Sequence, residues 1–201
     1  MRSPIDDYLE RVLSECRDDD GGEVASGNRE LEQADPSSFG IALATIDGTV
    51  YTAGDADHEF SIQSIGKVPA YALALRDRGL DAVLERVDTE PSGDAFNEIS
   101  LDPVTGHPRN PMINAGAILA SSMLLPPTRD VDAATVDRVF GEVLEFYSAC
   151  AGRTLTIDDD VYRSEAATGS RNRAIAYMLD SFGVVDTLPD AALDLYYRQC
   201  S

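Results

Sequence analysis

The stretch Phe60-Ser-Ile-Gln-Ser-Ile-Gly-Lys67 contains the only lysine of the chain, three residues after Ser64. On a helix, side chains three positions apart share a face, so this spacing brings the Ser64 hydroxyl within reach of the Lys67 amine. A nucleophile and its base need that arrangement. The other 15 basic residues are all arginine. The pattern therefore predicts a Ser-x-x-Lys catalytic pair, and the alternative is an exposed basic residue on a helix.

The residues around this stretch predict a helix over 61–78, because apolar side chains recur there at helical spacing. Pro69 is tolerated in a first turn, so the helix should begin between Gln63 and Gly66. Ser64 would then lie at the N-terminal end. Unpaired amides and the positive end of the helix dipole favour developing negative charge at that place.

The rest of the chain predicts one β-hairpin and many helices. A strand over 39–46, the turn Asp47-Gly48 and a returning strand over 49–53 form the hairpin. Helical periodicity covers 5–16, 81–85, 114–125, 131–150, 164–182 and 188–200, whereas 21–38 and 88–111 are expected to be irregular. This order indicates an α/β (α+β) protein whose helices form a lobe of their own.

Composition excludes several kinds of function. The net charge of −20 and the sequence pI near 4.2 disfavour nucleic acid and anionic membranes as partners. No apolar run is long enough for a membrane span, and the N-terminus is too polar for a signal peptide, so we expect a cytoplasmic protein. Three cysteines without metal-ligand spacing predict reduced thiols, and the acidic runs at 18–20 and 158–160 predict solvated carboxylates.

Asparagines mark the irregular stretch and the helix after it. Asn97 and Asn110 offer donors and acceptors to a polar ligand, or they cap turns. Asn114 opens the helix over 114–125, so ligand binding competes with a role as N-cap. Further on, Glu165 and Asn172 are seven residues apart, which is two helical turns. A carboxylate beside an amide could hold an α-ammonium group, or the segment is a helix start capped by Ser164 or Thr168.

Five motifs in order resemble the serine-dependent glutaminases. They are Phe60 to Lys67, Ser92-Gly-Asp-Ala-Phe-Asn97, Asn110-Pro-Met-Ile-Asn-Ala-Gly-Ala117, Ser164-Glu165 through Arg171-Asn172, and Leu195-Tyr-Tyr-Arg-Gln-Cys-Ser201. The resemblance implies a serine β-lactamase or penicillin-binding-protein-like fold, an antiparallel sheet packed against a helical lobe. It also implies hydrolysis of L-glutamine to L-glutamate and ammonia without metal or organic cofactor, by a protein that is a homo-oligomer.

The resemblance assigns roles to particular residues. Ser64 would be the nucleophile and Lys67 its base, and the substrate-binding positions would be Ser64, Asn114, Glu165, Asn172 and Tyr196. Tyr197, next to Tyr196, is expected to pack. For Lys67 to act as a base near neutral pH, its pKa must fall well below about 10.4.

Members of the family run longer than this chain, so we expect a C-terminally truncated protein with an incomplete sheet. The expected parts are the hairpin and nucleophile helix over 1–78, a helical lobe over 79–187, and the start of the return to the sheet over 188–201. Two alternatives remain: a truncated, non-catalytic homologue that binds glutamine or full-length subunits, and a penicillin-recognising serine hydrolase.

Overall fold

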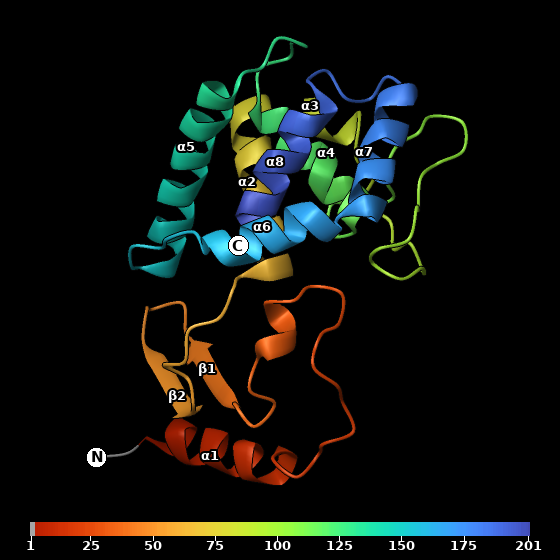
Figure 1. Ribbon diagram of the computed structural model, residues 1–201. Helices are drawn as coiled ribbons and strands as arrows, with labels where there is room; N and C mark the ends of the chain where they lie inside the picture. Colours follow the sequence, from red (N-terminus) through yellow and green to blue (C-terminus); the bar gives the residue numbers. More distant parts are fainter. Residues whose placement is uncertain (1–2) are drawn as a thin grey trace. The chain divides into compact units, whose positions relative to one another are not determined.

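The computed structural model describes residues 3–201, which divide into two compact units, one up to residue 60 and one from residue 61 onwards. The first unit is a helix and a hairpin (Figure 1), and the second is helical. Across the described residues, no helix is long and apolar enough to cross a membrane.

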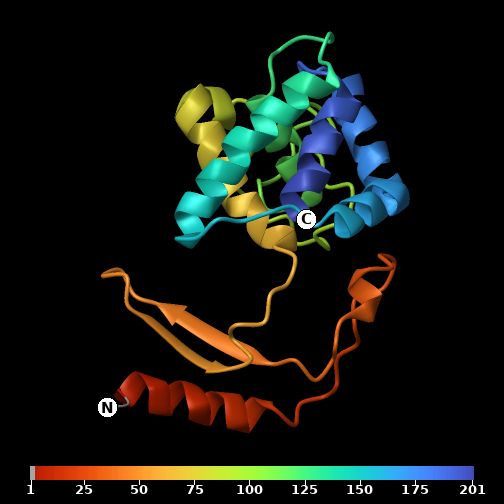
Figure 2. The same cartoon turned by 60° about the vertical axis from the view of Figure 1, so that its left-hand side comes forward.

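The first unit packs helix α1 against the two strands. Helix α1 (Pro4–Cys16) begins at a capping box, in which Ser3 and Asp6 exchange side-chain and backbone hydrogen bonds. A 3₁₀ turn η1 (Leu31–Gln33) and strands β1 (Gly40–Ala44) and β2 (Val50–Gly54) follow. The strands are antiparallel with Ala42 opposite Thr52, and α1 buries Leu9 and Leu13 against β2 (Figure 2). The predicted hairpin is confirmed.

The second unit is built around helix α4 (Asn114–Leu124), which is buried along nearly all of its length. A helix that is apolar on every side belongs in a core. The other helices of this unit are η2 (Gln63–Gly66), α2 (Lys67–Arg78), α3 (Leu80–Leu84), α5 (Ala133–Ala151), α6 (Asp159–Thr168), α7 (Ser170–Ser181) and α8 (Pro189–Cys200). Helix α8 packs against α4 and lies between α5 and α7 (Figure 1).

Helix α4 can approach its neighbours closely because several of its side chains are small. At Gly116, an added Cβ would lie 2.0 Å from the Asn110 carbonyl oxygen, so only glycine fits. The irregular segment before α4 is held in turn by Asn110, whose side chain accepts from the amides of Met112 and Ile113 and donates to the Glu90 carbonyl. Of the two roles expected for Asn110, the structural one is observed.

Two predicted helices differ in detail from those observed. The helix over 61–78 begins as the 3₁₀ turn η2 and becomes α-helical at Lys67. The prediction of a single helix over 164–182 is wrong, because the chain forms two helices that meet at Gly169. Its predicted caps are wrong as well: Asp158 caps α6 by accepting from the amides of Asp160 and Val161.

Gly169 explains the break between α6 and α7. A Cβ at this position would lie 2.0 Å from the Tyr197 hydroxyl oxygen, and the same hydroxyl donates to the Gly169 carbonyl at 3.1 Å. Helical periodicity in the sequence continues across this point, so only the contact with α8 shows where one helix ends and the next begins.

Candidate active site

Lys67 is the first residue of α2 and its side chain is only 4% exposed. Its Nζ donates to the Met112 carbonyl at 3.0 Å and to Asn114 Oδ1 at 2.8 Å. The same nitrogen lies 5.5 Å from the centroid of the Phe96 ring. Burial lowers the pKa of Lys67, because removal from water disfavours the ammonium form. The alternative of an exposed basic residue on a helix is therefore wrong.

Ser64 lies in η2, three residues before Lys67, and is exposed. Side chains three apart are eclipsed on a 3₁₀ turn, so the turn places the hydroxyl and the amine on the same side of the chain. Both hydrogen bonds of Lys67 go to the segment before α4 and to α4 itself, and neither goes to Ser64. The three-residue spacing places Ser64 and Lys67 on one side of the turn, and the hydrogen bonds of Lys67 attach its amine to the start of α4.

Asn114 connects Lys67 to the next residue of the candidate site. Its Oδ1 accepts from Lys67, and its Nδ2 donates to Asn172 Oδ1 at 3.0 Å. The N-cap of α4 is Ile113, without a side-chain cap, so Asn114 does not act as the N-cap, and its role in ligand binding stays a prediction. A chain of three polar side chains, Lys67, Asn114 and Asn172, runs from α2 through α4 to α7.

Glu165 and Asn172 are arranged differently from the prediction. They lie on separate helices, α6 and α7, and do not share a face over two turns. Both are near residues of α8: after burial, which is the largest cause, the charge of Glu165 also raises the pKa of Tyr196 and of Tyr197, whereas hydrogen bonding by Asn172 lowers the pKa of Tyr197. Burial is the larger cause of both tyrosine shifts, so both hydroxyls stay protonated.

Tyr197 therefore combines packing with a polar contact. It is 3% exposed and lies in the core cluster with Tyr196, with the two ring centroids 5.8 Å apart. Its hydroxyl donates to Gly169, at the break between α6, which carries Glu165, and α7, which carries Asn172. Packing was predicted for this residue, and the hydroxyl contact was not.

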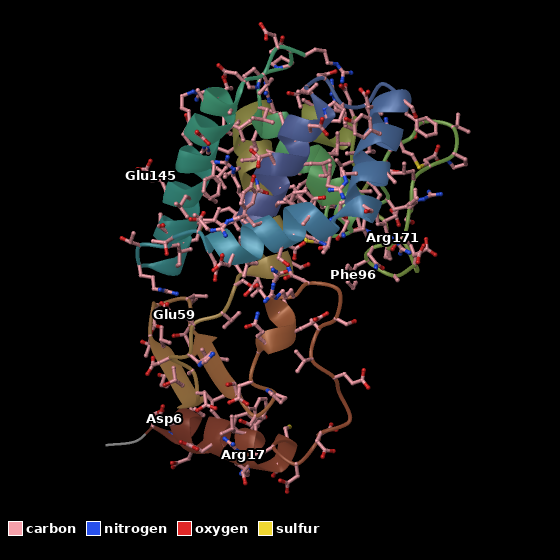
Figure 3. The ribbon with its side chains drawn as sticks, in the orientation of Figure 1. Asp6, Arg17, Glu59, Phe96, Glu145 and Arg171 are labelled. Carbon is pink, nitrogen blue, oxygen red and sulfur yellow. The ribbon has the colours of Figure 1, made fainter. Side chains whose placement is uncertain are left out.

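Cys200 and Phe96 are two neighbours of these residues that the sequence did not point to. Burial raises the pKa of the Cys200 thiol to about 12, while the charge of Lys67 and a hydrogen bond with Tyr196 act in the opposite direction. Phe96 lies in the irregular segment near Arg171 (Figure 3), and Arg171 donates to the neighbouring Asn97 carbonyl. A lone cysteine and a phenylalanine in an irregular segment are common in any sequence. Only the folded structure therefore shows that Cys200 and Phe96 lie near the candidate site.

Comparisons with known proteins match this chain to one family. The glutaminase family model matches residues 22–201. The chain belongs to the glutaminase family. A glutaminase from Corynebacterium efficiens is 44% identical over 202 residues, which cover 100% of this chain and 46% of that protein. One from Trichormus variabilis is 42% identical over 199 residues, which cover 99% of this chain and 58% of that protein.

Solved glutaminase structures support the same conclusion. The native form of Mglu superposes with a TM-score of 0.89 at 42% identity, covering 100% of this chain and 47% of Mglu. The probable glutaminase ybaS superposes with a TM-score of 0.88 at 34% identity, covering 98% of this chain and 62% of ybaS. The predicted mixed α/β, β-lactamase-like class is confirmed, and the family match favours glutaminase over a penicillin-recognising hydrolase. This glutaminase chain spans about half the length of the first relatives it matches.

Proposed function

We propose that this chain carries the residues that hydrolyse L-glutamine to L-glutamate and ammonia through an acyl-enzyme on Ser64. The observation that carries the proposal is the environment of Lys67, the only lysine, which is buried and hydrogen-bonded three residues after an exposed serine. Membership of the glutaminase family supports the choice of substrate.

The two hydrogen bonds of Lys67 suit a neutral amine. A neutral amine has two N–H donors and one lone pair. Because Met112 and Asn114 each accept one N–H, the lone pair is left to take the proton of the Ser64 hydroxyl. Burial lowers the pKa of Lys67 and so raises the fraction of the protein that holds this neutral form.

In the first half-reaction, Ser64 Oγ attacks the side-chain amide carbon of glutamine and gives its proton to Lys67. Backbone amides at the start of η2 would stabilise the oxyanion that forms on the amide oxygen. Lys67 then returns the proton to the leaving nitrogen, and ammonia departs. In the second half-reaction, water attacks the γ-glutamyl ester, which releases glutamate and restores the Ser64 hydroxyl.

Four residues are proposed to select an α-amino acid. Glu165 would bind the ligand's α-ammonium group, and Asn114 or Asn172 would donate to its α-carboxylate, with Tyr196 completing the site. An analogue without these groups would leave buried polar partners unpaired, so it would bind poorly. Because Asn114 also accepts a hydrogen bond from Lys67, the same side chain would contact the substrate and influence the protonation of Lys67.

The second candidate is a non-catalytic homologue that binds glutamine or associates with full-length subunits. The turnover assay and the glutamine-dependent melting curve described next distinguish it from the catalytic proposal. In either case, we propose that the protein is cytoplasmic, as its polar N-terminus suggests, and that it forms homo-oligomers, as the family resemblance implies.

The test is glutamate release from L-glutamine by the purified chain, with Ser64→Ala as the control. Release that is lost in Ser64→Ala supports the proposed reaction and its nucleophile. No release from a folded chain whose melting temperature rises with glutamine supports the second candidate. No release and no rise in melting temperature would contradict both.

A further inference from the structure

Gln63, the residue before Ser64, has a backbone conformation that side chains rarely adopt. Its φ is 47°, and it is the one residue other than glycine with positive φ within the part of the chain that the structure describes. Such a conformation costs free energy and persists only where the surroundings impose it. The cause must therefore lie in the contacts of the Gln63 side chain or of the turn that follows.

The side chain of Gln63 attaches the turn to the end of α8. Its Nε2 donates to the Cys200 carbonyl at 3.2 Å and to Ser61 Oγ at 3.3 Å. The last carbonyls of a helix have no partner within the helix, so the Cys200 oxygen is free to accept. The bond connects residues 137 positions apart in the sequence.

The residues after Ser64 are attached as well. The Tyr147 hydroxyl donates to the Gly66 carbonyl at 2.5 Å. A Cβ at Gly66 would lie 2.6 Å from the Gln199 carbonyl oxygen, so α8 leaves room there for glycine alone. The turn is thus held by Gln63 on one side of Ser64 and by Gly66 on the other.

Ser64 contributes no such contact itself. Its side chain is exposed, and within residues 3–201 its backbone amide donates to no carbonyl. The direction of its hydroxyl and of its amide therefore depends on the dihedral angles of the neighbouring residues, above all those of Gln63.

We propose that Gln63 is a positioning residue, which acts through its amide bond to the Cys200 carbonyl to hold the η2 turn so that Ser64 faces its substrate and Lys67. The proposal rests on the proposed function of Ser64. The hydrogen bonds of the Gln63 side chain go to Ser61 and Cys200, and not to Lys67 or to the side chains proposed to bind the α-amino acid group. It is a positioning residue and not a catalytic one.

Two substitutions separate the role of the side chain from that of the backbone. Both Gln63→Ala and Gln63→Gly remove the amide. Alanine keeps the strain of a positive φ, whereas glycine relieves it but adds flexibility. An effect that both variants share is therefore due to loss of the Gln63 side-chain amide. Gln33→Ala is the matched control, because Gln33 is an exposed glutamine of η1.

We expect both Gln63 variants to lower kcat for glutamine by about tenfold to a hundredfold, the size of effect caused by a nucleophile misplaced by about 1 Å. KM should stay within about twofold, and Gln63→Gly should keep or raise the melting temperature of the wild type. Gln33→Ala should match the wild type in kcat. A kcat that is unchanged in both variants, or that falls only in step with melting temperature, overturns the proposal.

Amide hydrogen exchange tests the positioning role independently of turnover. The amides of Ile65, Gly66 and Lys67 should exchange at least about fivefold faster in both Gln63 variants, while those of α4 stay unchanged, because the attachment to α8 is local. If the wild type releases no glutamate, the proposed function fails. The positioning role is then judged only from the amide exchange rates of the variants and the wild type. Equal exchange in the variants and the wild type overturns it.

Discussion

The lowered pKa of Lys67 can be measured directly, because this chain has a single lysine. Protein labelled with 15N at lysine Nζ gives one side-chain signal, so a pH titration by NMR needs no assignment. We expect a midpoint below the ordinary value of about 10.4, because burial disfavours the ammonium form. A midpoint at or above that value would refute the proposed base.

Two substitutions at Asn114 should move the titration midpoint of Lys67 in opposite directions. Asn114→Asp places a carboxylate where Oδ1 now lies 2.8 Å from Nζ. Two unit charges 4 Å apart interact by about 4 kcal/mol at an effective dielectric constant of about 20. Spreading the charge over two oxygens and allowing partial solvation leaves roughly 2.7 kcal/mol, which raises the midpoint by about two pH units at about 1.36 kcal/mol each.

Asn114→Leu gives the opposite change. It removes the acceptor and supplies a side chain of similar size, so the ammonium form loses a hydrogen bond and the midpoint should fall below that of the wild type. Asn110→Asp is the matched control, since it adds the same charge to a side chain that bonds backbone groups and not Lys67. Equal midpoints in Asn114→Asp and Asn110→Asp would contradict the assigned contact.

The same shift predicts how stability depends on pH. Between the folded pKa of Lys67 and the unfolded value of about 10.4, the unfolded chain binds one more proton than the folded chain. The free energy of unfolding therefore gains up to about 1.36 kcal/mol per pH unit from Lys67 as pH rises through that window. Urea titrations of Lys67→Met should lack this contribution, and equal pH slopes in the variant and the wild type would argue against it.

Three further predictions concern stability. Tyr147→Phe removes the donor to the Gly66 carbonyl and should lower the free energy of unfolding by about 1–2 kcal/mol, as measured by urea denaturation; no loss would show that the bond is not formed. Gly169→Ala should cost about 1–3 kcal/mol, because its Cβ overlaps the Tyr197 hydroxyl, whereas Gly141→Ala, on a helix face with nothing within 4 Å, should be neutral or stabilising; equal effects would contradict the close approach. The net charge of −20 predicts that the melting temperature rises as NaCl increases from about 0.1 to 1 M, because salt screens repulsion among the carboxylates; a flat or falling curve would argue that this repulsion is small.

Short-range patterns in the sequence were enough to predict the local elements, and the order of five motifs was enough to indicate the family. The hairpin over 40–54 and the helices at both ends of the chain follow from short-range patterns, namely apolar periodicity and a turn dipeptide. The pairing of Ser64 with Lys67, predicted from their three-residue spacing, stays a prediction. Asn114 and Asn172 were selected because their motifs stand in the order of a known family, and the structure places them in contact. The division of the chain at 78 and 187 and the roles of the site residues stay predictions.

The end of α6 and the start of α7 could be located only in the folded chain, because periodicity continues through Gly169 and the break depends on Tyr197, 28 residues later. It also decided that Asn114 bonds Lys67 and leaves the helix uncapped, and that Gln63 is attached to Cys200. Each of these contacts joins residues far apart in the sequence. Their free energy depends on distance and burial in the folded chain, which no local pattern of residue types encodes.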